Sequence, residues 1–133
     1  MDALTVAPRI LVVDDEPDLL AEIVAYLSRR HQAVVGAASV AEAHRLFNAH
    51  RGTLSLVLSD VRMPDGDGVE LVRSVLRQSG GTCRCLLVTG HFEHAELDVE
   101  LRQAGVEIIY KPFSFSQLYA RVTANLPAAA AAR

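Results

Sequence analysis

Five short apolar runs, rich in β-branched residues, alternate along the chain with segments of helical spacing. The runs occupy residues 9–13, 33–38, 54–59, 84–89 and 107–110. Each run is nearly continuous rather than alternating, which is typical of strands that helices cover on both faces. Strands separated by single helices pair in parallel through right-handed crossovers. The sequence therefore predicts an α/β fold with a doubly wound, five-stranded parallel sheet in a three-layer α/β/α arrangement.

The intervening segments carry apolar residues at helical spacing and recognisable helix ends. The first segment opens on Pro17, which suits the first turn of a helix. The second, residues 39–47, begins with a serine three residues before Glu42, a pattern that predicts a capping box. The other three helices are expected over residues 69–76, 94–103 and 114–125.

Length and charge restrict the classes of function. The 133 residues fit one compact domain, which we place at residues 1–126, followed by an alanine-rich tail or linker at 127–133. The formal charge is −3, with no basic stripe, so we expect no nucleic-acid binding by this chain alone. No stretch reaches the roughly 18 apolar residues of a membrane span, which predicts a cytoplasmic location without membrane attachment. Cys83 and Cys85 are interpreted as ordinary strand residues.

Reactive side chains stand where four of the five predicted strands end. They are Asp14, Asp15 and Glu16 after the first strand, Asp60 after the third, Thr89 with the fourth and Lys111 after the fifth. Taken singly, each has an ordinary interpretation as a helix cap, a turn residue or a solvated charge. In an open parallel sheet, however, the carboxyl ends meet at one edge, where ligands bind. The combination predicts a functional site.

The chemistry of this set indicates phosphoryl transfer. Three carboxylates that converge repel one another unless a cation joins them, and Mg²⁺ prefers oxygen ligands while leaving room for a phosphate oxygen. A carboxylate of this set can then act as a nucleophile toward phosphorus and form an acyl phosphate. Lys111 and Thr89 would contact the phosphoryl oxygens as a point charge and a hydroxyl donor.

Four motifs follow one another along the chain: DDE at 14–16, D-x-x-M-P-x-x-x-G at 60–68, T-G at 89–90 and K-P-F at 111–113. In this order and spacing, the chain resembles the receiver domains of two-component response regulators, from about residue 9 to residue 125. The resemblance implies a flavodoxin-like sheet with strand order 2-1-3-4-5, as in the CheY-like superfamily.

The resemblance also implies roles for the residues at the strand ends. Asp60 would be the phosphoacceptor. Asp15, Asp60 and the backbone carbonyl of Arg62 would bind Mg²⁺, and Asp14 would assist through a water molecule. The phosphoryl group would come from the phosphohistidine of a sensor histidine kinase or phosphotransfer protein.

Further implied features concern the switch that phosphorylation operates. Lys111 would contact the phosphoryl group, Thr89 would move toward it on activation, and the bond from Lys111 to Pro112 would be cis. The output surface would comprise the fourth helix, fifth strand and fifth helix, between residues 94 and 125. The domain would catalyse only its own phosphorylation and dephosphorylation, so we do not expect an enzyme in the turnover sense.

The chain departs from the family pattern at the position three residues before the lysine. The family usually has an aromatic residue there, whereas this chain has Ile108. Tyr110 falls on the same strand face, and we expect it to take over part of the switch role. Arg62 and His91 lie two residues beyond Asp60 and Thr89, where we expect them to tune the lifetime of the phosphoryl group.

Two other functions fit parts of the pattern. An interaction module of this fold would work without phosphorylation, although its site residues would then have no role. A haloacid-dehalogenase-like phosphatase would need a D-x-D motif, which DDE at 14–16 does not supply. We expect an output domain after residue 126 or a separate docking partner, and we count a second copy of the chain, in a homodimer, among the candidate partners.

Overall fold

A five-stranded parallel sheet forms the centre of the computed structural model, which describes residues 7–30, 32–90 and 97–127. Its strands are β1 (Ile10–Val13), β2 (Val34–Ala37), β3 (Leu56–Asp60), β6 (Arg84–Thr89) and β7 (Glu107–Tyr110). Their spatial order is β2-β1-β3-β6-β7, and every pairing is parallel. The predicted order 2-1-3-4-5 is confirmed, because β6 and β7 are the fourth and fifth strands of this sheet.

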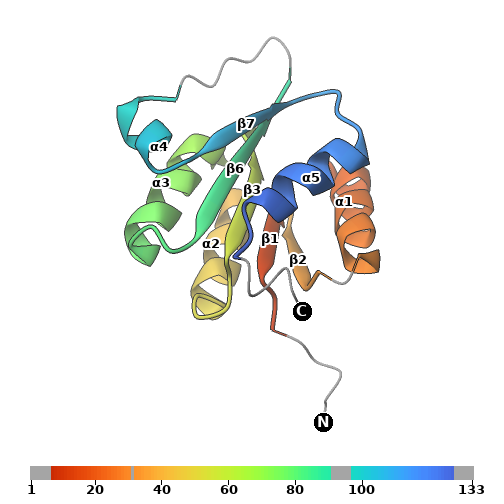
Figure 1. Cartoon of the computed structure of the whole chain (residues 1–133), viewed down its shortest axis with the longest axis horizontal. Coiled ribbons are helices and arrows are strands. Elements are labelled where there is room, and N and C mark those ends of the chain that lie inside the picture. Colours follow the sequence, from red (N-terminus) through yellow and green to blue (C-terminus); the bar gives the residue numbers. More distant parts are fainter. Residues whose placement is uncertain (1–6, 31, 91–96, 128–133) are drawn as a thin grey trace.

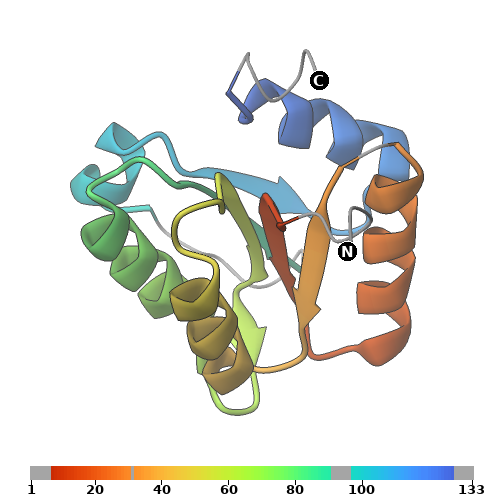
Figure 2. The same ribbon diagram turned by 90° about the horizontal axis from the view of Figure 1, so that it is seen from below.

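Helices cover both faces of the sheet (Figures 1 and 2). One face packs against α1 (Pro17–Arg29) and α5 (Phe115–Ala124), and the other packs against α2 (Val40–Ala49), α3 (Gly68–Ser79) and α4 (Val99–Gln103). The strands are continuously apolar because successive side chains enter two different cores. The fourth helix begins at Val99, and residues 94–96 of its predicted span lie outside the described residues.

The helix ends follow the capping signals, with one difference. The Ser39 hydroxyl accepts a hydrogen bond from the Glu42 N–H at 3.1 Å. The Glu42 carboxylate, however, accepts from the N–H of Ala38 rather than from that of Ser39, so only half of the predicted capping box forms. A complete capping box is found at the start of α5, between Ser114 and Gln117.

A short hairpin that the apolar pattern did not predict follows β3. It consists of β4 (Arg62–Met63) and β5 (Gly66–Asp67), which pair in antiparallel orientation. Two-residue strands have no periodicity to detect, because alternation needs four or more residues. The hairpin leads directly from Asp60 to α3, and it therefore shapes the edge at which the polar residues gather.

Two further features bear on the sequence predictions. Cys83 and Cys85 are free thiols buried in the core. Cys85 lies in β6, as predicted, whereas Cys83 precedes this strand in a bend, so its interpretation as a strand residue was wrong. Within the described part of the chain, no helix has the length and apolar character required to cross a membrane.

Candidate functional site

Three carboxylates meet at the carboxyl edge of the sheet. β1 and β3 are paired in register, with Val13 beside Ser59, so the acids that follow these residues become neighbours. Oxygens of Asp14, Asp15 and Asp60 all lie within 4.8 Å of one another. The expected convergence of the strand ends therefore brings the three acids together.

The fifth strand of the sheet brings a cation to this cluster. Lys111 follows β7 directly, and its N–H donates to the Thr89 carbonyl at 2.8 Å, which extends the pairing of β6 with β7. Its Nζ lies 3.4 Å from Asp60 Oδ2, 3.8 Å from Asp14 Oδ2 and 3.6 Å from Glu16 Oε1. The contact with Glu16 was not expected. The peptide bond from Lys111 to Pro112 is cis, as the resemblance implied.

Burial separates the roles of the acids. Asp14 is almost fully buried, and its Oδ1 accepts a hydrogen bond from the Glu16 N–H at 2.9 Å. The Asp60 side chain retains an exposed fraction of 11%, so it is only partly buried. Asp14 is thus tied into the fold, whereas Asp60 can be reached from outside.

Burial and the neighbouring charges shift the pKa values of the groups in this cluster. Burial raises the pKa of Asp14, and the charge of Asp60 raises it further, although the hydrogen bond from the Glu16 N–H acts in the opposite sense. Burial also raises the pKa of Asp60, with a smaller contribution from the charge of Asp15, while Lys111 lowers it. Burial alone would lower the pKa of Lys111, but the surrounding carboxylates outweigh this effect and raise it. One lysine therefore compensates the carboxylates only in part.

Thr89 stands at the end of β6, beside the cluster. The residue is buried, and its hydroxyl donates to the Gly90 carbonyl at 3.3 Å. Asp60 pairs with Val88 in the sheet, and Thr89 is the next residue along β6. Among the described residues other than its chain neighbours, no heavy atom lies within 4 Å of the place where a side chain on Gly90 would begin.

Gly68 closes the segment that begins at Asp60. Its N–H donates to the Val61 carbonyl at 2.7 Å, and a Cβ atom at this position would lie 1.9 Å from the Asp60 carbonyl oxygen. Glycine is therefore required by the close approach of two backbone segments. A left-handed backbone conformation is not the reason, because the glycines with positive φ in the described backbone are others. This steric requirement accounts for the glycine that ends the motif at residues 60–68.

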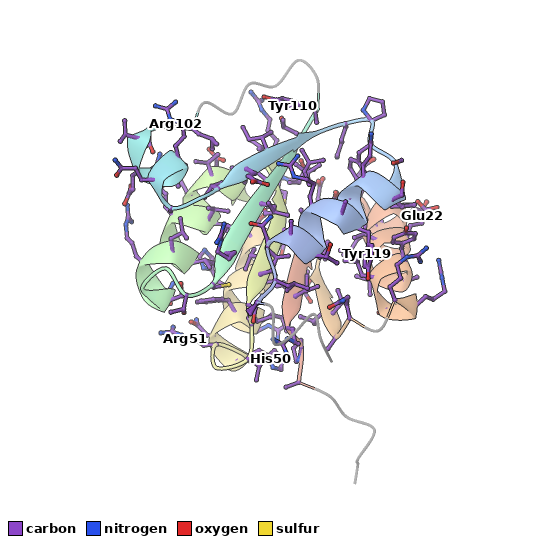
Figure 3. The ribbon with its side chains drawn as sticks, in the orientation of Figure 1. Glu22, His50, Arg51, Arg102, Tyr110 and Tyr119 are labelled. Atoms are coloured by element: carbon purple, nitrogen blue, oxygen red, sulfur yellow. The ribbon has the colours of Figure 1, made fainter. Side chains whose placement is uncertain are left out.

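The residues expected to modulate the site have different positions. Arg62 lies in β4 with an exposed side chain, next to the segment of Asp60. His91 lies outside the described residues. Ile108 packs against the core that includes α2, α3 and α4, while Tyr110 is 53% exposed and lies on the outside of the molecule (Figure 3). Both line a groove of about 350 Å³ between β7 and α5.

Comparisons with known proteins agree on one family. A family model described as the response regulator receiver domain matches residues 10–123. The transcriptional regulatory protein AruR of Pseudomonas aeruginosa is 34% identical over 122 residues, which cover 89% of this chain and 49% of AruR. PrrA of Mycobacterium tuberculosis, also a transcriptional regulatory protein, is 34% identical over 131 residues, covering 95% of this chain and 53% of PrrA. The chain thus spans about half the length of these curated relatives.

Solved structures show the same similarity in three dimensions. The receiver domain of the hybrid histidine kinase CckA has a TM-score of 0.74 and 30% identity, covering 90% of this chain and 99% of that domain. A response regulator receiver domain protein from Clostridium thermocellum has a TM-score of 0.76 and 26% identity, covering 89% and 93% of the two chains.

Proposed function

The chain belongs to the receiver domains of two-component response regulators, and we propose that its phosphoacceptor is Asp60. One observation carries this assignment. Asp60 lies 3.4 Å from Lys111 Nζ and its side chain is partly exposed, whereas Asp14 lies 3.8 Å from the same atom and is buried. An incoming phosphoryl group can reach Asp60 and meet the lysine at the same time.

The donor set fits Mg²⁺. Three carboxylates with oxygens within 4.8 Å of one another are hard ligands, and Lys111 alone does not balance their charge. Asp15, Asp60 and the backbone carbonyl of Arg62 would hold the ion, with Asp14 acting through a water molecule. When bound, Mg²⁺ would neutralise negative charge on the phosphoryl oxygens.

The side chains would divide the work of phosphoryl transfer. An Asp60 oxygen attacks the phosphorus of a phosphohistidine, so that an O–P bond forms while the P–N bond breaks and the histidine leaves. Lys111 stabilises charge on one phosphoryl oxygen, and the Thr89 hydroxyl donates to another after a small movement. Later attack by water on phosphorus releases inorganic phosphate and restores Asp60. The domain thus modifies itself and turns over no separate substrate.

The acyl phosphate would act as a timed switch for partner binding. The donor would be a sensor histidine kinase or a phosphotransfer protein. The output surface would comprise α4, β7 and α5, where Tyr110 is exposed beside the groove that Ile108 lines. A change from about 1% to 99% active would need a bias of roughly 5.5 kcal/mol from phosphorylation. In this proposal, residues 1–126 form the receiver, and residues 127–133 serve as a tail or a linker toward an output domain.

Intact-protein mass spectrometry tests the proposal. Wild type and Asp60→Ala are incubated with acetyl phosphate, each with Mg²⁺ and with EDTA. We expect one phosphoryl adduct in wild type that requires Mg²⁺ and is absent from Asp60→Ala. Absence of an adduct in wild type would favour a phosphorylation-independent interaction module. An adduct that persists in Asp60→Ala but is lost in Asp14→Ala would favour a phosphatase-like site.

A further inference from the structure

The turn of the hairpin β4–β5 is attached to a helix that lies far away in the sequence. Asp65 Oδ1 accepts a hydrogen bond from the Val40 N–H at 2.9 Å, and Asp65 Oδ2 accepts from the Ala41 N–H at 3.1 Å. Figure 2 shows the hairpin beside the beginning of α2. Since the first N–H groups of a helix have no partner within it, Asp65 supplies a cap to α2 from another part of the chain.

The electrostatics of this contact are favourable. The hydrogen bonds from Val40 and Ala41 lower the pKa of Asp65, so its carboxylate is ionised at neutral pH. Negative charge is also favoured at the N-terminus of a helix, and hydrogen bonds to an ionised acceptor are stronger than neutral ones. No role for Asp65 follows from the motif that surrounds it.

The same hairpin belongs to the segment that joins Asp60 to α3. Its far end is fixed by the hydrogen bond from the Gly68 N–H to the Val61 carbonyl and by Asp67, whose Oδ1 accepts from the Val69 N–H at 2.8 Å. Its middle is fixed by the buried side chain of Met63. Asp65 is the hydrogen-bonded anchor that ties the tip of the hairpin to α2.

We propose that Asp65 is a positioning residue for phosphoryl transfer, because it holds the hairpin, and with it the Arg62 carbonyl, in register with Asp60. This inference rests on the proposed function, in which the Arg62 carbonyl is a ligand of Mg²⁺. In this proposal the Asp65 carboxylate would act indirectly, because its oxygens bind the N–H groups of Val40 and Ala41 and it does not belong to the acidic cluster at the end of the sheet. Groups that orient metal ligands in this indirect way typically change metal affinity by about 10-fold to 100-fold when they are removed.

The chain offers a matched control on the same helix. Ser39 also caps α2, through the hydrogen bond that its hydroxyl accepts from the Glu42 N–H, and this contact does not involve the hairpin. Asp65→Ala and Ser39→Ala each remove one cap from α2. They are expected to lower stability by similar amounts, whereas only Asp65→Ala releases the hairpin.

Two measurements separate positioning from capping. The first is Mg²⁺ affinity, obtained by titrating the amide chemical shifts of each variant. We expect about tenfold weaker binding in Asp65→Ala and little change in Ser39→Ala. The second is amide hydrogen exchange of residues 61–68 in EDTA. Faster exchange of the Val61 and Gly68 amides is expected in Asp65→Ala only, because these N–H groups donate to the Val88 and Val61 carbonyls.

Equal Mg²⁺ affinity and equal exchange in the two variants would overturn the inference and leave Asp65 as a helix cap. Asp65→Asn keeps one acceptor oxygen and serves the same comparison if Asp65→Ala does not fold. The rate of adduct formation with acetyl phosphate should fall in parallel with Mg²⁺ affinity. A wild type that forms no adduct would overturn the proposed function instead, while hydrogen exchange in EDTA would still decide whether Asp65 holds the hairpin.

Discussion

Asp60→Asn should stabilise the metal-free domain. Oxygens of Asp14 and Asp15 lie within 4.8 Å of Asp60, which at an effective dielectric constant near 20 corresponds to repulsion of at least about 3.5 kcal/mol from each acid. The attraction of Lys111 Nζ at 3.4 Å contributes about 5 kcal/mol in the opposite sense. Because Asp15 is partly exposed and therefore screened, we expect a net gain of about 1 kcal/mol when the charge is removed.

The sign of the pH dependence follows from the raised pKa of Asp60. The destabilisation is fully present above the folded-state pKa and disappears as pH falls toward the unfolded value of 3.8. The advantage of Asp60→Asn over wild type should therefore be largest near neutral pH and shrink in acid. Added Mg²⁺ should reduce or reverse it, since only wild type keeps the full ligand set and ligand binding stabilises the folded state.

Urea unfolding followed by circular dichroism, in EDTA and in Mg²⁺, measures these differences. A gain of about 1 kcal/mol corresponds to a rise of roughly 3–4 °C in Tm for a domain of this size. Asp65→Asn is the matched control, because the same chemical change there removes a carboxylate whose pKa is lowered by backbone N–H donors and should destabilise. A lower unfolding free energy for Asp60→Asn than for wild type in EDTA at pH 7 would refute the electrostatic reasoning.

Three further outcomes can be checked directly. Gly68→Ala should lower the unfolding free energy by roughly 2 kcal/mol or more in urea titrations, because its Cβ would lie 1.9 Å from the Asp60 carbonyl; an unchanged midpoint would contradict this steric reason. Cys83 and Cys85 should react with a thiol reagent only after unfolding, since both are buried and burial raises the pKa of Cys83 to about 12; rapid labelling of the native protein would disprove this. Tyr110→Ala should weaken phosphorylation-dependent partner binding in pull-down assays without changing the yield of the phosphoryl adduct, and unaltered binding would remove Tyr110 from the switch.

Much of the site was predictable because strand ends are easy to read in a parallel α/β sequence. The ends of the apolar runs mark the positions of Asp14, Asp60 and Lys111, and parallel pairing then brings these residues to one edge of the sheet. The contact of Lys111 with Glu16 was less accessible, because it depends on the path of a flexible side chain across the site.

The hairpin after Asp60 illustrates what could not be predicted. Its strands have two residues each, so no periodic pattern reveals them. The close approach of Gly68 to the Asp60 carbonyl and the capping of α2 by Asp65 join backbone segments through their positions in space. The choice of Ala38 rather than Ser39 as the partner of Glu42 also depends on local geometry that residue types alone do not specify.

The sequence by itself determined the layered α/β architecture and the kinds of side chain at the site, because hydrophobic periodicity and chain order dictate which residues are buried and where strands end. Tertiary structure alone decided the distances among the carboxylates and Lys111, the burial that raises the pKa values of Asp14 and Asp60, and the attachment of Asp65 to α2. These quantities depend on separations of a few ångströms between residues far apart in the chain, and only packing in three dimensions sets such separations.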